Sequence, residues 1–202
     1  MTCTLRVFLV CLVMLPLLGC YIPVKFDAEI TLSRTGNYGV EFAGYIADAT
    51  LYQDLVQNKL TAVQERDKAA LIKRDLLRDS SMEKADYYRT GHFDILYKRV
   101  SDILRDRQFT FIRRNEEIIT LAYDPQRGAV TVRGKSIGQA NARRLRDMGL
   151  WVEGEIRLRT DGPVFNHNAT TVREGQNPGE TLLVWTISSP YDPAPTAVIG
   201  IR

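Results

Sequence analysis

The side chains that most often carry out covalent or metal chemistry are scarce in the body of this chain. The three cysteines, Cys3, Cys11 and Cys20, all fall within the first 20 residues. The two histidines, His92 and His167, lie 75 positions apart, and the carboxylates around them do not form a metal-binding motif. We therefore expect no metal site, no cofactor and no disulfide in the fold.

No catalytic nucleophile is identified either. The only thiol beyond the first 19 residues is that of Cys20. Glu116 and Glu117 are adjacent carboxylates, but neighbouring side chains of a strand point to opposite faces, so they do not form an acid–base pair. We expect the protein not to be an enzyme.

Two arginines and one histidine are candidate ligand-binding residues. Arg143 and Arg146 are three positions apart, so they can share one face of a helix and meet a phosphate or a lipid headgroup. His167, between Asn166 and Asn168, can bind a polar headgroup. The alternatives are a solvated helix face for the arginines, and for His167 a loop histidine that is hydrogen-bonded to nearby backbone.

The first 19 residues have the organisation of a secretory signal peptide. One basic residue, Arg6, precedes 12 uninterrupted apolar residues at 7–18, and a small residue, Gly19, follows. A helix that spans a membrane needs roughly 20 apolar residues, so this run is too short.

The end of that run resembles the lipobox of bacterial lipoproteins. Leu17, Gly19 and Cys20 match it, whereas Leu18 stands where a smaller residue is usual. The resemblance implies cleavage between Gly19 and Cys20 and a diacylglyceryl thioether on Cys20. The alternatives are an ordinary signal peptide in which Cys20 is incidental, or an uncleaved anchor.

The expected location and partners follow from the signal peptide and the resemblance to a lipobox. We expect a lipoprotein of the cell envelope, held on a membrane by lipid on Cys20 and facing the periplasm or the exterior. Tyr21 rather than Asp follows Cys20, which fits outer-membrane sorting if the cell has two membranes. From Cys20 onward there are 26 basic and 24 acidic residues, and this near balance does not indicate nucleic acid as a partner.

The elements expected in the first half are strands around one long helix. After a short tether at 21–25, alternation of apolar and polar residues over 24–47, with turn residues at 34–37, predicts a β-hairpin. Apolar spacings of three, four and seven over 49–78 predict one amphipathic helix. Residues 79–107 fit either a second helix, because Ser80 and Glu83 have capping-box spacing, or a strand at 91–100 followed by a turn at 101–106.

The second half predicts mostly strands. We expect strands at 109–113, 151–159, 182–187 and 196–201, a hairpin from 118–123 to 129–133, and a short helix at 136–148 that Gly149 ends. These elements predict an α+β fold, mainly an antiparallel sheet with one long and one short helix packed on one side. Residues 1–19 would be the signal peptide and residues 20–202 a single domain.

The last third of the chain carries a second resemblance. In order along the chain are the segments Thr160–Val164, His167–Ala169 and Leu183–Trp185. This order resembles the small α+β domain of envelope lipoproteins of the LppM type. The resemblance implies a non-enzymatic envelope protein that binds lipid or glycolipid. The matched residues look structural: Gly162-Pro163 as a turn, Asn168 as a loop-stabilising side chain, Trp185 as core.

Two functional hypotheses remain. One is a binding module that holds a lipid or amphipathic ligand between the sheet and the long helix, which predicts a sizeable apolar pocket. The other is an interaction protein that docks on another envelope complex, which predicts an exposed apolar patch or edge strand.

Overall fold

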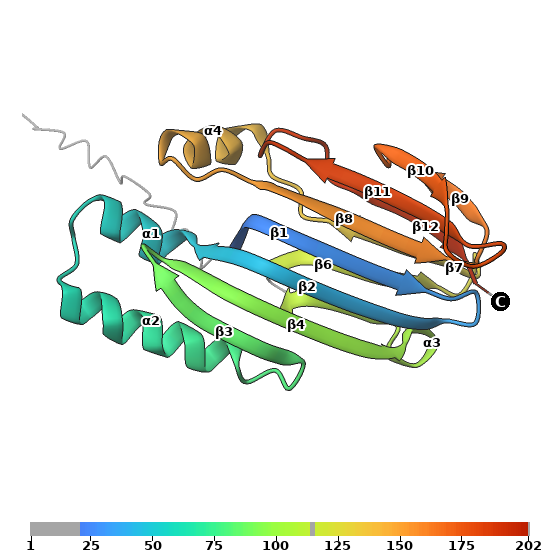
Figure 1. Ribbon diagram of the computed structural model, residues 1–202, viewed down its shortest axis with the longest axis horizontal. Helices are drawn as coiled ribbons and strands as arrows, with labels where there is room; N and C mark the ends of the chain where they lie inside the picture. The colour runs from blue at the N-terminus through green and yellow to red at the C-terminus, as the bar shows by residue number, and fades with distance from the viewer. Residues whose placement is uncertain (1–20, 114–115, 202) are drawn as a thin grey trace, which may run out of the picture.

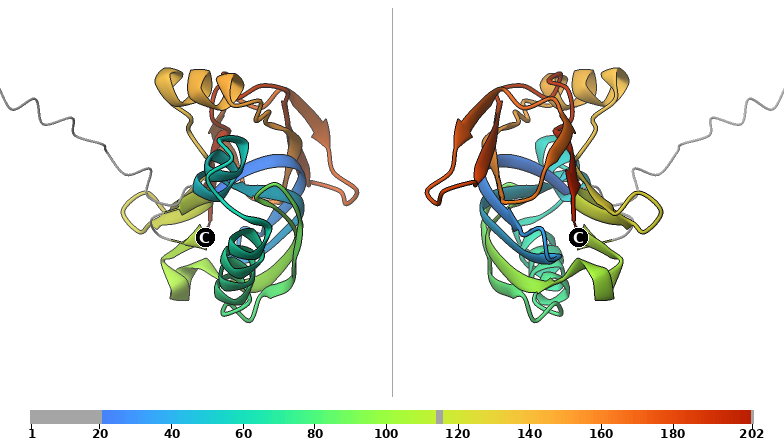
Figure 2. Two further views of the ribbon diagram at one scale, coloured as in Figure 1. Left: turned by 90° about the vertical axis from the view of Figure 1, so that its left-hand side faces the viewer. Right: turned by 90° about the vertical axis from the view of Figure 1, so that its right-hand side faces the viewer.

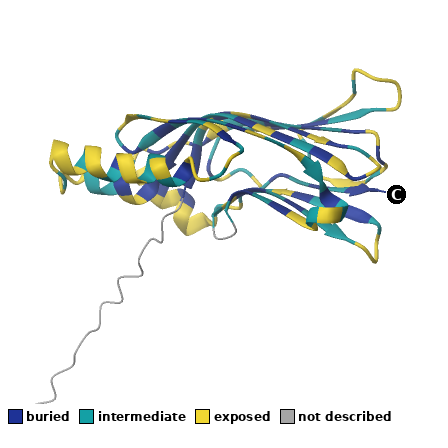
Figure 3. Cartoon of the chain, turned by 90° about the horizontal axis from the view of Figure 1, so that it is seen from below, coloured by how far each residue is buried: buried dark blue, intermediate teal, exposed yellow. Residues whose placement is uncertain are grey.

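The computed structural model describes residues 21–113 and 116–201, in which two β-sheets lie face to face (Figures 1 and 3). The predicted signal peptide, the cleavage position at Gly19 and the lipidated Cys20 lie outside the described residues.

The larger sheet has seven strands in the order β10-β11-β8-β1-β2-β4-β3. Neighbouring strands in it are antiparallel except β1 and β8, which run parallel. The strand bounds are β1 Tyr21–Leu32, β2 Asn37–Asp48, β3 Met82–Arg89, β4 His92–Asp102, β8 Glu153–Thr160, β10 Thr171–Glu174 and β11 Thr181–Ile187.

The smaller sheet has five strands in the order β5-β6-β7-β12-β9, all antiparallel. Its strand bounds are β5 Gln108–Arg113, β6 Glu116–Asp124, β7 Ala129–Gly134, β9 Val164–His167 and β12 Thr196–Gly200.

Aromatic side chains join the two sheets. Phe111 of β5 lies with its ring centre 4.8 Å from that of Phe42 on β2 and 4.6 Å from that of Tyr97 on β4. Phe42 also stacks on Phe26 of β1 at 5.2 Å. All four side chains are at most 5 % exposed. Period-two alternation directs such residues to the inner face of each strand, so the core is the layer between the sheets.

The single long helix predicted over 49–78 is wrong. The structure has α1 at Ala49–Val56 and α2 at Ala62–Leu76. Asn58 between them has φ +52°, which a helix does not allow. Thr61 then caps α2 with a complete capping box to Gln64. The other helices are α3 at Ile103–Asp106 and α4 at Gln139–Asp147.

The ambiguous segment 79–107 is mostly strand. Residues 82–89 form β3 rather than a second helix, and the strand expected at 91–100 is β4. Backbone irregularities next to Met82 and Tyr87 break the alternation of β3. The turn expected at 101–106 contains the end of β4 and α3. The tether expected at 21–25 is instead the start of β1, because its backbone pairs with β2.

The α+β class with mainly antiparallel pairing is confirmed, as are both predicted hairpins and the short helix before Gly149. Among the described residues no helix is both long and apolar enough to cross a membrane.

Candidate functional site

The strand register brings several chain segments to one end of the molecule. Tyr21, the first residue of β1, pairs with Asp48 at the end of β2. On the other side of β1, Lys25 lies opposite Glu153 near the start of β8, and Gly154 pairs with Ile187 at the end of β11. We call this the Tyr21 end. Figure 2 (left) looks at it, with α4 at the top and α2 below.

A groove of about 540 Å³ opens at the Tyr21 end between α4, the start of α1 and the segment that joins β7 to α4. We call it the α4 groove. Its lining residues are Ile22, Ala49, Gln53, Lys135, Ser136, Ile137, Asn141, Arg144, Leu145, Asp147 and Met148.

The lining of the α4 groove is amphipathic. Ile22, Ile137 and Met148 give it apolar walls. Lys135 and Arg144 are basic, and neither side chain has an ion pair within the described residues. Such a lining suits a ligand that has both an apolar part and an anionic group.

A C-terminal motif fixes the position of α4. Gly149 has φ +78°, and its N–H donates to the carbonyl of Arg146 at 2.9 Å. The N–H of Leu150 donates to the carbonyl of Leu145, also at 2.9 Å. This is a Schellman motif, and the side chains of Leu145 and Leu150 are both buried. The apolar contact holds one face of α4 on the domain and leaves the groove beside it.

Tyr52 links α1 to the C-terminal end of α4. Its hydroxyl donates to the carbonyl of Met148 at 2.9 Å. The ring of Tyr52 meets the ring of His92 edge-on, and Nδ1 of His92 lies 2.9 Å from the carbonyl oxygen of Thr90. His92 therefore supports the fold at this end.

Two carboxyl groups with raised pKa values lie near the α4 groove. Burial raises the pKa of Asp48, although the N–H of Leu51 donates to it at 2.8 Å and opposes the shift. Burial also raises the pKa of Glu116, with Arg113 opposing it. Oε2 of Glu116 is buried and has no hydrogen-bond partner in the described part of the chain. Burial, and then Asp48, raise the pKa of Tyr21.

Sequence reasoning missed one motif. Gly134-Lys135-Ser136-Ile137-Gly138 has the Gly-x-Ser-x-Gly spacing of a nucleophile elbow and lies between a strand and a helix. The geometry does not support catalysis, because Ser136 is exposed and is not in the positive-φ conformation of an elbow. None of the hydrogen bonds of the described residues joins it to a histidine or a carboxylate.

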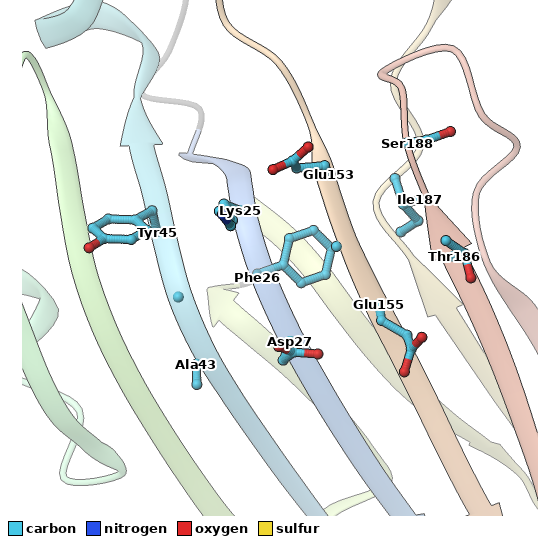
Figure 4. Close-up of a pocket in the computed structure, with 12 residues that line it drawn as sticks. Lys25, Phe26, Asp27, Ala43, Tyr45, Glu153, Glu155, Thr186, Ile187 and Ser188 are labelled. Carbon is cyan, nitrogen blue, oxygen red and sulfur yellow. The ribbon is translucent and has the colours of Figure 1, made fainter.

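A second concavity of about 630 Å³ lies across the outer face of β2, β1, β8 and β11 (Figure 4). We call it the outer-face groove. Its floor includes Gly44 and Gly154, the strand neighbours of Phe26 on either side. A Cβ on Gly154 would lie 2.4 Å from the carbonyl oxygen of Phe26, so the close approach of β8 to β1 at this point requires a residue without a side chain.

The outer-face groove is mainly acidic, and two of its carboxylates are already paired. Arg157 Nη1 lies 3.2 Å from Asp27 and 2.6 Å from Glu155. The hydrogen bond that Arg157 donates to Glu155 is the main reason why the pKa of Arg157 is raised. These charges satisfy one another on the sheet surface.

The candidate residues from the sequence do not meet at one site. Arg143 and Arg146 are exposed on α4 but do not line the α4 groove, whereas Arg144 between them does. His167 lies on β9 and accepts a hydrogen bond from the N–H of Ala169 at 3.1 Å, as the backbone-bonded alternative expected.

The matched residues near His167 have structural contacts. Trp185 is 3 % exposed, and its Nε1 donates to Oδ1 of Asn168 at 2.8 Å. The same oxygen accepts from the N–H of Thr196, and Nδ2 of Asn168 donates to the carbonyl of Ala194. Asn168 therefore holds the segment before β12.

Neither a metal site nor a ligand space between the sheets is found in the described chain. Its His, Cys, Asp and Glu side chains form no group of three that could hold a metal ion. The gap between the sheets beside Ile30, Ile119 and Trp185 is too small for a water molecule. The α4 groove and the outer-face groove, both large enough for a ligand, are on the surface.

Comparison with known proteins finds likeness among solved structures. No family model matches the sequence, and no curated protein matches it. Among solved structures, the folded domain of LppM from Mycobacterium tuberculosis, determined by NMR, is similar with a TM-score of 0.45. The identity is 10 % over 93 % of this chain and 95 % of that chain. This is the lipoprotein type that the C-terminal segments resemble.

Proposed function

We propose that this protein is a non-enzymatic envelope lipoprotein whose domain binds one anionic amphipathic ligand in the α4 groove. The observation that carries the proposal is the combination of apolar walls with Lys135 and Arg144, basic side chains that form no ion pair among the described residues. The volume of about 540 Å³ is within the usual range for small-molecule sites.

The position of the groove supports the same proposal. Ile22 lines it and follows Cys20 by only two positions. If Cys20 carries the lipid anchor, consecutive Cα atoms about 3.8 Å apart keep the groove close to the membrane. An amphiphile leaving the bilayer would then have a short path to it, with its acyl part on Ile137 and Met148 and its anionic group near Arg144.

The anchor itself is tested by Cys20→Ala. The substitution should abolish incorporation of labelled fatty acid and leave the precursor uncut by the lipoprotein pathway, because the acylated atom is gone. Labelling and gel mobility measure both effects, with Cys11→Ala as the control that keeps them. Unchanged labelling in Cys20→Ala would show that Cys20 does not carry the lipid anchor.

Ligand binding is tested with lysophosphatidylglycerol below its micelle concentration and the unacylated chain from Cys20 onward. Calorimetric titration should show saturable binding that Lys135→Glu/Arg144→Glu weakens by about 100-fold. Hydrogen bonds to charged groups contribute about 1.5–3 kcal/mol each, and 1.4 kcal/mol is a factor of ten.

The matched control is Arg143→Glu/Arg146→Glu, which makes the same change of charge on α4 at positions that do not line the groove. It should change the affinity by no more than about fivefold, as for exposed charges. If both pairs of substitutions weaken the binding of lysophosphatidylglycerol equally, the ligand is attracted by general positive charge and not bound in the α4 groove. An absence of saturable binding would overturn the proposed ligand class.

A further inference from the structure

The side of α4 that does not face the groove carries its own set of residues. At 100° per residue, Arg143 and Arg146 lie on one side of the helix, roughly 130° around the axis from Arg144. Both are exposed. Arg146 Nη2 lies 3.0 Å from Asp147, whereas Arg143 has no ion pair within the described residues.

Two exposed aromatic residues lie at the same end. Trp151 follows α4 and is 45 % exposed, and its Nε1 donates to the carbonyl of Ser188 at 2.8 Å. Tyr191 is in the loop after β11 and is 37 % exposed. The N–H of Tyr191 donates to Oγ of Ser189 at 3.2 Å, next to the residue that accepts from Trp151, so Tyr191 and Trp151 belong to the same end of the molecule. The pKa of Arg146 is raised first by its hydrogen bond to Asp147 and then by Tyr191.

Basic charge is concentrated in the same part of the chain. From Arg133 to Asp147 there are five basic residues and one acidic residue. The whole chain from Cys20 onward has 26 basic and 24 acidic residues, so the remainder has a net negative charge. This segment leads into and forms α4, so the positive excess lies at the Tyr21 end.

We infer that Arg143, Arg146, Trp151 and Tyr191 form a surface that docks on an anionic lipid bilayer and sets the orientation of the domain. Arginine binds phosphate groups through several N–H donors. Tryptophan and tyrosine favour the boundary between headgroups and acyl chains. The inference goes beyond the proposed function, because this surface is separate from the α4 groove and requires no ligand there.

The first test measures partition of the unacylated chain from Cys20 onward onto phosphatidylglycerol/phosphatidylcholine vesicles. Each basic residue near an anionic surface contributes about 1 kcal/mol, which is about fivefold. Arg143→Gln/Arg146→Gln should therefore lower the partition about 25-fold. The control, Arg127→Gln/Arg173→Gln, removes two exposed arginines in the turn before β7 and on β10, and should leave the partition within about fivefold of the unchanged chain.

The second test reports orientation without depending on natural acylation. Cys20 is the only cysteine from that position onward, so the chain can be coupled to vesicles through a maleimide lipid. The chain has two tryptophans, the exposed Trp151 and the buried Trp185. Phosphatidylcholine with brominated acyl chains, in vesicles that also contain phosphatidylglycerol, should quench the fluorescence of Trp151, and Trp151→Phe should remove that quenching.

The outcomes separate this inference from the proposed function. Loss of quenching in Arg143→Gln/Arg146→Gln, with lysophosphatidylglycerol affinity retained, supports the docking surface. Quenching that is absent, or equal on vesicles of phosphatidylcholine alone, overturns it and leaves the α4 groove as proposed. Partition unchanged by the arginine pair also overturns it.

Discussion

The α4 groove and the outer-face groove are similar in volume but differ in what their charged groups already contact. Of the charged residues that line the outer-face groove, Asp27 and Glu155 pair with Arg157, and the other two, Lys25 and Glu153, have opposite charges and lie opposite each other on β1 and β8. In the α4 groove, Lys135 and Arg144 have no such partner within the described residues. Paired surface charges contribute little to ligand binding, because they must be separated and desolvated first. We therefore take unpaired charge of one sign beside apolar walls, rather than volume, as the mark of a candidate site.

The two grooves also differ in how they are built. The floor of the outer-face groove includes the backbone of Gly44 and Gly154, where any side chain would meet the strand beside it. The α4 groove is bounded by side chains of a helix and a connecting segment, and a Cβ on Gly138 would meet nothing within 4 Å. The outer-face groove is thus part of the sheet itself, whereas residues that line the α4 groove can be substituted without disturbing the fold.

The largest expected effect breaks the outer-face groove. Gly154→Val places a branched side chain against the carbonyl and the ring of Phe26 and should lower the free energy of unfolding by about 3 kcal/mol or more. Gly138→Ser, at the N-terminus of α4, should change it by less than about 1 kcal/mol. Urea denaturation of both variants measures the difference, and equal stabilities would show that the glycine is not required.

A smaller effect concerns the carboxylates near each groove. Glu116 is partly buried with one oxygen unpartnered among the described residues, so Glu116→Gln should raise the free energy of unfolding at pH 7 by up to about 1 kcal/mol. Asp27 is exposed and paired with Arg157, so Asp27→Asn should lower it by about 0.2–1 kcal/mol. We therefore predict changes of opposite sign in the free energy of unfolding, measured by urea denaturation. A loss of stability in both variants would contradict this prediction.

The pH dependence follows from the direction of the Glu116 shift. Its folded pKa is raised above the ordinary value of 4.5, so the folded form holds its proton more tightly than the unfolded chain. The stability that it contributes is therefore fully present below pH 4.5 and is lost as the pH rises through the folded pKa. Glu116→Gln should remove this part of the pH dependence.

Much of the strand structure could be predicted from the sequence, because period-two alternation is a local signal. The hairpin of β1 and β2 and that of β6 and β7 are examples. The break between α1 and α2 was missed, although Thr61 and Gln64 carry a capping-box signal, because the apolar spacing continues across it. The strand β3 was not predicted, because its alternation of buried and exposed residues is irregular and its pairing with β4 is not visible in the local sequence.

The site was less predictable than the fold. The sequence favoured Arg143 and Arg146 from helical spacing, but which side of α4 packs on the domain depends on the Schellman contact of Leu145 and Leu150. The parallel pairing of β1 with β8 joins segments over 120 residues apart, and no local pattern encodes it. That pairing brings the residues after α4 to the Tyr21 end.

Methyl NMR of the methionines tests the proposed ligand site most directly. From Cys20 onward the methionines are Met82, buried on β3, and Met148, which lines the α4 groove. In a chain with ¹³C-labelled methionine methyl groups, titration with lysophosphatidylglycerol should shift the Met148 signal in a saturable way and leave Met82 unchanged. Saturable binding that leaves the Met148 methyl signal unshifted would show that the ligand binds outside the α4 groove and would contradict the proposed site.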